Sequence, residues 1–333
     1  MSDAALVVVV AIALAFDFTN GFHDTANAVA TSVSTRALSP RTAVLIAAIM
    51  NFLGAFTSTK VAKTVGGGLI NTEPGFVTAH LLFAALAGAI VWNLLTWRLG
   101  LPSSSTHALI GGLLGAALAR GGQNPVDWSN LWNKTVWPGI TSPFIGFVLA
   151  GLLMLVILWG FRRVRPAPLN RGFRILQIAS GSFLAFAHGT NDAQKTMGVM
   201  ALALYASGHT SSPADIPDWV IASAAASMAA GTYIGGWRIM RTMGTRIFKL
   251  RPPQGFAAQV TASGVLYTVA TKYGFPVSTT HVISGSVMGA GATTKMSAVR
   301  WGVAADIVGA WLLTIPAAAI VSAVLYGVLS VIF

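Results

Sequence analysis

Two segments of this chain place acidic, amide and imidazole side chains inside otherwise apolar sequence. They read FTNGFHDTANA (residues 18–28) and AHGTNDAQKTMG (residues 187–198). Each puts three polar groups at spacings that share one helix face: Asn20, Asp24 and Asn27, then His188, Asp192 and Lys195. Carboxylates within a membrane are costly and by default mark an ion or substrate path. The pattern predicts that the two aspartates bind coupling cations or protons, with a structural Asp192–Lys195 ion pair as the alternative.

A second pair of motifs predicts two helix breaks. LPSSSTHALIGG (residues 101–112) and FPVSTTHVISGS (residues 275–286) each hold a proline, then Ser and Thr residues, then a histidine. Proline cannot donate a backbone hydrogen bond, and Ser104 and Ser278 are placed to cap the helices that follow. Because a helix N-terminus attracts anions, two such ends predict an oxyanion site with the hydroxyls of Ser104, Ser105, Thr106, Ser278, Thr279 and Thr280. The alternative is that these hydroxyls only bond to their own backbone or join helices.

An oxyanion beside bare carboxylates requires a cation. Asp24 has no basic neighbour at helical spacing, and a bare carboxylate repels an anion strongly at low dielectric. We therefore expect cations or protons on Asp24 and Asp192 to neutralise an anion held by the two half-helix ends. Lys195 either contacts the anion as a point charge or only pairs with Asp192.

Four histidines adjoin these motifs. His107 and His281 follow the two caps at equivalent positions, and His23 and His188 adjoin the aspartates. Each could exchange a proton or donate to the substrate, and a structural hydrogen bond is the alternative. The chain has no cysteine and no His-x-x-x-His pair, which argues against thiolate zinc sites and metal-hydrolase chemistry. The only metal expected is a sodium ion.

The composition places these motifs in a membrane. Of 333 residues, 54% are apolar and only 9% are charged, whereas about a quarter of a soluble chain is charged. The formal net charge of +12 indicates basic loops beside membrane spans rather than a nucleic-acid partner, since Lys and Arg mark the cytoplasmic side. We expect an all-α, multi-pass protein of the lipid bilayer whose first apolar run is a retained helix.

Matched segments indicate an internal duplication. Besides the two pairs above, KVAKTVG (residues 60–66) overlays RIMRTMG (residues 238–244) in the same order. We therefore divide the chain into a first transmembrane repeat, 1–165, and a second, 166–333, which together form one transport domain.

The charge pattern predicts that the two repeats have inverted topology. Basic residues within 162–174 and 238–251 mark cytoplasmic loops, so that both termini lie outside the cytoplasm. The expected spans are 4–35, 42–58, 136–160, 173–206, 219–237 and 299–332, with re-entrant helical hairpins at 76–119 and 256–291. An extra pair of crossings in each half would leave this orientation unchanged. Inverted repeats with broken helices are typical of secondary transporters, which bind substrate and ions near the midplane.

The motifs NGFHDTANAVAT, AHGTNDAQKTMG, PSSSTH and PVSTTH resemble the signatures of the inorganic phosphate transporter (PiT) family, and especially its bacterial low-affinity phosphate permeases. The resemblance covers essentially the whole chain. It implies secondary active import of inorganic phosphate by symport with H⁺ or Na⁺ across the cell membrane, by a homo-oligomer with no other cofactor and no enzymatic activity.

The resemblance also implies roles for individual residues. Asp24 and Asn27, with Asn191 and Asp192, are similar to the family's paired Asn-Asp signature at the cation and phosphate site. The phosphate ligands it implies are Asn27, Ser104, Ser105, Thr106, Asn191, Lys195, Ser278, Thr279 and Thr280. The ligands expected for the coupling cation are Asn20, Asp24, Asn27, Asn191 and Asp192.

This chain departs from the common family form at a few positions. His23 and Lys195 stand where that form has asparagine, and Asn51 and Gln259 stand where other members carry a membrane carboxylate. These departures favour proton coupling, or carriage of a metal-phosphate, over sodium coupling.

Two alternatives are kept for the substrate and for the class of protein. The first is a sulfate permease of the same fold, although a carboxylate acceptor favours HPO₄²⁻, which alone has a proton to donate. The second is an intramembrane metal-dependent hydrolase that uses Asp and His. Asp306, a further acid in an expected span, has no counterpart in the other repeat, and we assign it a packing or gating role.

Overall fold

The computed structural model describes residues 1–122 and 124–332 and is almost entirely helical. The helices of the first repeat are α1 (Asp3–Ser34), α2 (Pro40–Ala55), α3 (Lys60–Gly67), α4 (Ala79–Leu99), α5 (Ser105–Arg120), α6 (Trp128–Leu131) and α7 (Trp137–Gly160). Those of the second are α8 (Pro166–Ala206), α9 (Asp218–Ile234), α10 (Trp237–Arg241), α11 (Pro252–Thr268), α12 (Thr279–Ala292) and α13 (Trp301–Ile332). Short π-helical and 3₁₀ segments are η1 (Trp132–Val136), η2 (Thr242–Arg246), η3 (Val269–Tyr273) and η4 (Met296–Ala298).

Most expected spans correspond to observed helices with slightly shifted ends. Helix α8 differs, because it begins at Pro166 rather than at residue 173. Arg165 is extended and proline suits the first helical turn, so the helix starts there. The expected span 42–58 also differs, because α2 ends at Ala55 and α3 follows at an angle of 71°.

Several segments have the length and composition of a membrane crossing. They are α1, α4, residues 128–160 and α13, and the bent pair α2–α3 would be a further one. Helix α4 was expected to be the first arm of a re-entrant hairpin rather than a crossing. It has the length of a crossing, but it ends at Gly100, which is buried within the protein.

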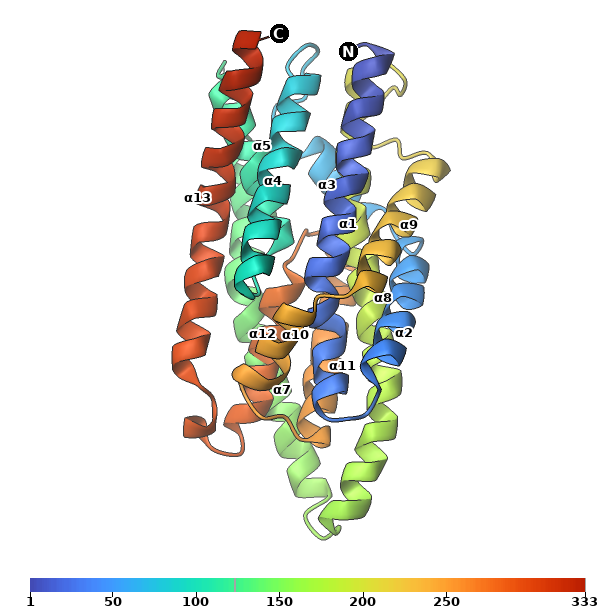
Figure 1. The fold of residues 1–333 in the computed structure, drawn as a ribbon, viewed down its shortest axis with the longest axis vertical. Coiled ribbons are helices and arrows are strands. Elements are labelled where there is room, and N and C mark those ends of the chain that lie inside the picture. The colour runs from blue at the N-terminus through green and yellow to red at the C-terminus, as the bar shows by residue number, and fades with distance from the viewer. Residues whose placement is uncertain (123, 333) are drawn as a thin grey trace.

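Two helical hairpins approach the middle of the molecule from opposite ends (Figure 1). In α4–α5 the first arm ends at Gly100, and in α11–α12 it ends, after η3, at Gly274. These glycines have φ of +69° and +67°, a left-handed conformation that glycine adopts without the strain of a Cβ. The opposite directions of the two hairpins are those of inverted repeats.

The last long helix of each repeat covers the hairpin of the other repeat. Helix α13 packs against α4 and α5, and α7 packs against α11 and α12. The two repeats therefore interlock.

A polar layer separates two apolar cores. On α1, residues up to Phe16 belong to one core and residues from Ala26 belong to the other. The intervening turns of α1 hold the first acidic motif, and its polar side chains are buried.

Glycines allow close helix contacts beside both acidic motifs. A Cβ on Gly21 would lie 2.4 Å from the carbonyl oxygen of Met228 on α9, and one on Gly189 would lie 2.2 Å from that of Asn51 on α2. Only glycine fits at such distances, so these contacts fix the positions of Asp24 and Asp192, three residues further on.

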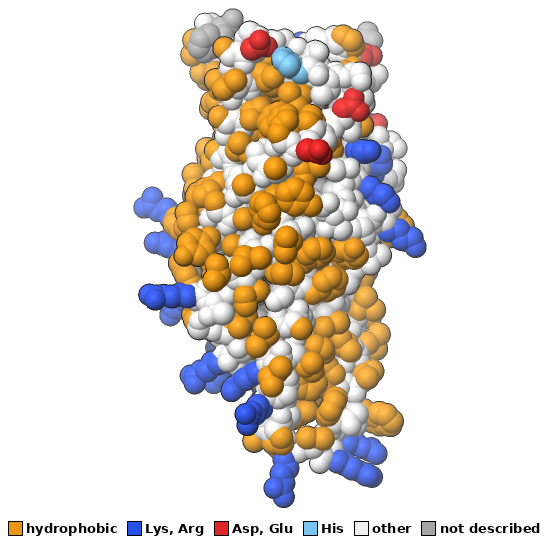
Figure 2. All heavy atoms as spheres, turned by 90° about the vertical axis from the view of Figure 1, so that its right-hand side faces the viewer, with side chains coloured by type: hydrophobic (Ala, Val, Ile, Leu, Met, Phe, Trp, Pro, Cys, Tyr) orange, Lys and Arg blue, Asp and Glu red, His pale blue; other side chains and the backbone are white. Residues whose placement is uncertain are grey.

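Apolar side chains cover much of the surface, and the charged side chains are unevenly distributed over it. On the face shown in Figure 2, acidic side chains gather near the end of the molecule that holds the termini, whereas Lys and Arg extend along the flanks and to the opposite end. Long exposed apolar side chains on α7 and α13, such as Leu152 and Leu312, are typical of a lipid-facing surface.

Candidate functional site

The two hairpin tips begin their second helices with the predicted caps. The Ser104 hydroxyl accepts from the His107 backbone N–H at 3.2 Å, and the Ser278 hydroxyl accepts from the His281 N–H at 3.3 Å. Both caps are confirmed. Each serine is only 1% exposed, so α5 and α12 begin inside the protein and not at its surface.

The tips contact each other through a reciprocal pair of hydrogen bonds. The Thr106 hydroxyl donates to the carbonyl oxygen of Val277 at 3.3 Å, and the Thr280 hydroxyl donates to that of Ser103 at 3.0 Å. Thr106 is equivalent to Thr280 in the repeat, and Ser103 is equivalent to Val277. The contact therefore follows the pseudo-two-fold symmetry of the two repeats.

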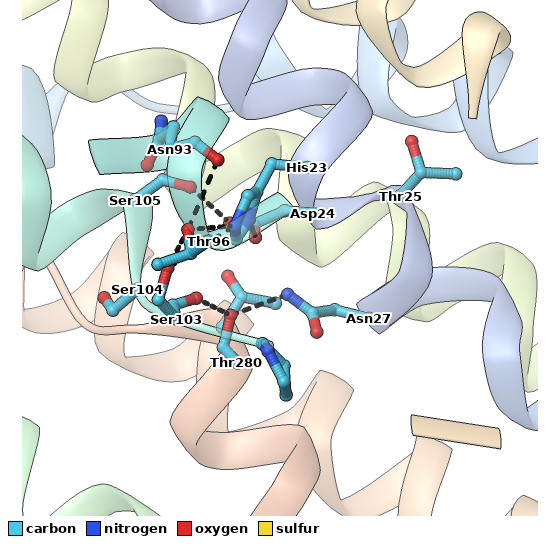
Figure 3. A network of polar contacts seen from close by, with 12 residues as sticks. His23, Asp24, Thr25, Asn27, Asn93, Thr96, Ser103, Ser104, Ser105 and Thr280 are labelled. Atoms are coloured by element: carbon cyan, nitrogen blue, oxygen red, sulfur yellow. Dashed lines mark hydrogen bonds and ion pairs between the residues drawn. The ribbon is translucent and has the colours of Figure 1, made fainter. Parts of the chain in front are cut away.

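The first aspartate lies at the tip of the α4–α5 hairpin (Figure 3). Ser105 donates to Asp24 Oδ2 at 3.2 Å, and His23 Nδ1 lies 2.8 Å from Asp24 Oδ1. The other ring nitrogen of His23 lies 3.1 Å from the Thr96 hydroxyl and 3.4 Å from that of Ser103. His23 thus links the carboxylate to α4 and to the tip.

The second aspartate has the equivalent contact and an added cation. Thr279 donates to Asp192 Oδ1 at 2.9 Å, as Ser105 does to Asp24. The Lys195 ammonium lies 2.7 Å from the same carboxylate oxygen and also donates to Thr106. The ion pair that the sequence offered as an alternative is therefore present, and the ammonium reaches the hairpin tip as well.

The amide residues of the two motifs also contact the tips. Asn27 Nδ2 donates to the Thr280 hydroxyl at 2.8 Å, the counterpart of the Lys195 contact with Thr106. Asn191 Nδ2 lies 2.6 Å from Asp192 Oδ1 and 2.8 Å from the Val277 carbonyl oxygen. The amide oxygens of both asparagines have no hydrogen-bond partner and remain open to a ligand.

Two carboxylates and one imidazole lie close enough together to hold a cation. Ligand atoms of Asp24, His188 and Asp192 all lie within 4.8 Å of one another, and all three residues are buried. His188 Nε2 is 3.5 Å from Asp192 Oδ2, and neither atom has a hydrogen bond. The other nitrogen of His188 lies 3.0 Å from Asn51 Oδ1.

His107 and His281 lie behind the tips. Their rings meet edge to face with centroids 4.7 Å apart. His281 also contacts Trp311 of α13 at 4.0 Å between ring centroids, and its Nδ1 lies 3.2 Å from the carbonyl oxygen of Gly139 on α7. The Nδ1 contact of His281 is the structural hydrogen bond given as the alternative, whereas His107 Nε2 and His281 Nε2 have no hydrogen-bond partner.

Some polar residues near the site were not singled out by the sequence analysis. Thr96 and Ser103 hold His23, and Asp17 is fully buried on α1. Asp17 lies seven residues before Asp24 and shares its helix face, a signal that the sequence contained. Asn20, expected as a cation ligand, is buried without a hydrogen bond. Asp306 is exposed on α13 and does not pack inside the protein, so the packing role expected for it is wrong.

Two stretches of the chain, residues 20–170 and 162–322, match the Phosphate transporter family. The chain belongs to this family. The resemblance of the motifs is thereby confirmed, and because the family consists of transporters, so is the prediction that the chain is not an enzyme. The intramembrane hydrolase is therefore excluded.

Relatives cover nearly the full length of this family member. A probable low-affinity inorganic phosphate transporter of Rhizobium meliloti (strain 1021) is 51% identical over 322 residues, 96% of this chain and 95% of the relative. One of the same description from Bacillus subtilis (strain 168) is 44% identical over 327 residues, 98% of each chain.

A solved structure has the same fold. It is described as the sodium-dependent phosphate transporter and covers 99% of this chain and 100% of its own, with a TM-score of 0.88 at 24% identity. This likeness confirms the predicted all-α membrane fold with two inverted repeats.

Proposed function

We propose that this member of the phosphate transporter family imports inorganic phosphate by symport with a cation. The observation that carries the proposal is the pseudo-symmetric meeting of two helix N-termini and two aspartates in a buried polar layer. The names of the relatives support phosphate as the substrate.

The hairpin tips supply the donors for the anion. The first turns of α5 and α12 offer backbone N–H groups and the positive ends of two helix dipoles. Ser105 and Thr279 now donate to Asp24 and Asp192. A cation on those carboxylates would compete for the same oxygens and leave the hydroxyl protons for phosphate oxygens.

A charge count explains why a cation has to accompany the anion. Asp24 and Asp192 bring two negative charges, and Lys195 offsets one of them at 2.7 Å. Phosphate adds one or two more negative charges to a buried site, where unpaired charge is expensive. We propose that H⁺ or Na⁺ on the Asp24 side supplies the missing charge.

The same residues could hold the metal of a metal-phosphate. Asp24, His188 and Asp192 offer two carboxylates and an imidazole within 4.8 Å, a ligand set that suits several divalent cations. A metal bound here would enter as part of the substrate and be released with it.

Uptake of radiolabelled phosphate into proteoliposomes tests the proposal. A Na⁺ gradient and a pH gradient are imposed in separate experiments, and we expect at least one of them to drive phosphate accumulation. Excess sulfate should inhibit this uptake only weakly. Strong inhibition by sulfate, with sulfate itself taken up, would assign the site to sulfate instead. Uptake that neither gradient drives would contradict cation symport. Repeating the assay with a divalent metal added, and again with the metal chelated, tests whether the substrate is a metal-phosphate.

We further propose that the protein resides in the cell membrane as a homo-oligomer with both termini outside the cytoplasm. The arginine-rich connection between α7 and α8 lies at the end opposite to the termini (Figure 1), as the positive-inside rule requires for this orientation. Because the chain has no cysteine, single cysteines placed at Ser2 and Gly172 allow labelling from one side. Labelling of Gly172→Cys in intact cells by an impermeant reagent would contradict the orientation. Chemical crosslinking in membranes tests the oligomer.

A further inference from the structure

A second buried polar cluster lies beside the central site. It consists of Asp17 and Asn20 on α1 and Thr196 on α8, each 0% exposed. Both carboxylate oxygens of Asp17, both amide atoms of Asn20 and the hydroxyl of Thr196 have no hydrogen-bond partner. Buried polar groups are normally satisfied, so a cluster of this kind indicates a bound species.

The cluster surrounds the carboxylate of Asp17. The Asn20 and Thr196 side chains are near enough to interact with this carboxylate, although they form no regular hydrogen bond with it, where α1 packs against α8. Asp17 precedes Asp24 by seven residues of helix, which is about 10 Å along the axis. Because α1 begins at the end of the molecule that holds the termini (Figure 1), Asp17 lies nearer that end than Asp24 does.

Helix α4 carries a further buried amide one turn before its contact with His23. His23 contacts Thr96, and α1 and α4 run side by side in the same direction (Figure 1). One turn back along each helix lie Asn20 and Asn93. The Asn93 side chain is 0% exposed, and neither of its amide atoms has a partner.

Asp17 has no counter-ion among the charged groups that face it. Those groups are Asp192 and Lys195, and the Lys195 ammonium is bound to Asp192. Helix α9 carries no basic residue, and α4 carries only His80 and Arg98, near its two ends. An ionised carboxylate buried without a counter-charge is strongly destabilising.

We propose that Asp17, Asn20, Asn93 and Thr196 form a second cation site, which takes a monovalent metal ion of the sodium type. Carboxylate, amide and hydroxyl oxygens are the ligands of hard cations, and a single carboxylate matches a single positive charge. A proton on Asp17 would satisfy one acceptor and leave the other oxygens unpaired. The site is additional to the proposed symport and does not depend on it, and it places a cation on the route between the termini and Asp24.

Sodium binding by the purified full-length protein tests this site without any transport assay. We would measure ²²Na⁺ bound per chain at equilibrium, in phosphate-free choline buffer, for the wild type and Asp17→Asn. The matched control is Asp306→Asn, the same chemical change on an exposed face of α13. We expect Asp17→Asn to bind one Na⁺ fewer per chain than the wild type, and the control to bind as many.

A second variant keeps the charge and covers the case in which Asp17→Asn does not fold. Thr196→Val removes one ligand oxygen with little change of shape, and we expect it to weaken this Na⁺ by roughly tenfold. Unchanged stoichiometry in Asp17→Asn, or unchanged affinity in Thr196→Val, would overturn the proposal. Infrared spectroscopy distinguishes a proton from Na⁺ at this site. A protonated-carboxyl band that is absent in Asp17→Asn and unchanged by added Na⁺ in the wild type would assign the site to a proton.

The result is separable from the proposed symport. Sodium bound at Asp17 by a protein whose phosphate uptake ignores sodium gradients would support this site and remove sodium coupling. If phosphate uptake is driven by sodium and Asp17→Asn binds as much Na⁺ as the wild type, sodium coupling is supported and the Asp17 site is removed.

Discussion

The two repeats build the central site from the same contacts but place different charges beside them. In each repeat a hairpin hydroxyl donates to an aspartate, Ser105 to Asp24 and Thr279 to Asp192. The equivalent contact to the opposite tip is made by the neutral Asn27 in the first repeat and by Lys195 in the second. The duplication thus supplies a symmetric cradle, and two side chains decide which aspartate has a permanent counter-ion.

This difference suggests unequal roles for the aspartates. Asp192 carries a tethered ammonium, so it needs no mobile cation to stay ionised. Asp24 forms its ion pair with an imidazole, that of His23, at 2.8 Å. We therefore assign the exchangeable cation to the first repeat, and the substitutions below test how the two repeats differ.

The largest effect is expected from Asp192→Asn. The change leaves the Lys195 ammonium buried without its carboxylate, and breaking a buried pair in this way costs about 3–5 kcal/mol. We expect phosphate uptake to be abolished while folded protein is still recovered from the membrane. Asp306→Asn is the matched control. Normal uptake by Asp192→Asn would refute the role assigned to Asp192.

Lys195→Asn makes the second repeat resemble the first. A mobile cation must then replace the ammonium beside Asp192, so we expect uptake to fall by roughly tenfold at low Na⁺ and to recover in part as Na⁺ is raised. Lys272→Asn removes an equal charge from an exposed position on η3 and serves as the control. A loss that no cation concentration reverses would indicate that Lys195 binds phosphate directly.

The threonines of the two tips test the same comparison on a smaller scale. Thr280→Val removes a contact with a neutral amide, worth about 0.5–1.5 kcal/mol, whereas Thr106→Val removes one with an ammonium, worth about 1.5–3 kcal/mol. Apparent phosphate affinity should therefore weaken in both and more in Thr106→Val. Thr271→Val, which affects a hydroxyl bonded within its own helix segment, is the control. Equal effects would mean that the ammonium adds nothing at the tip.

The smallest effects are expected at the glycines that end the first hairpin arms. Alanine at Gly100 meets only ordinary contacts and should cost about 1 kcal/mol for its left-handed φ. At Gly274 a Cβ would also lie 3.0 Å from both Cβ and the carbonyl oxygen of Lys60, so Gly274→Ala should destabilise more. Thermal unfolding of the two purified variants in detergent measures the difference, and a reversed order would contradict it.

Local patterns in the sequence predicted the parts of the site that depend on nearby residues. Ser104 and Ser278 are caps because each precedes a helix and follows a proline break. The duplication then related Asp24 to Asp192 and predicted that the two tips face each other. These features follow from spacing and equivalence, which a sequence displays directly.

Contacts set by packing between helices were harder to predict. Thr96 meets His23 from 73 residues away, and no local pattern relates α4 to α1. His107 and His281 have the spacing of site residues, yet they contact each other behind the tips. The bend between α2 and α3 was also missed, because the expected span ran on to residue 58, whereas α2 ends at Ala55 before the polar residues Thr57, Ser58 and Thr59.

Helices α7 and α13 each cover the hairpin of the other repeat, and this arrangement suggests how such a chain arose. A half-length ancestor would have exposed its hairpin to lipid unless an oppositely oriented copy sheltered it. Gene fusion would then have preserved a partnership already required between antiparallel subunits, after which the two halves could diverge at positions such as Asn27 and Lys195.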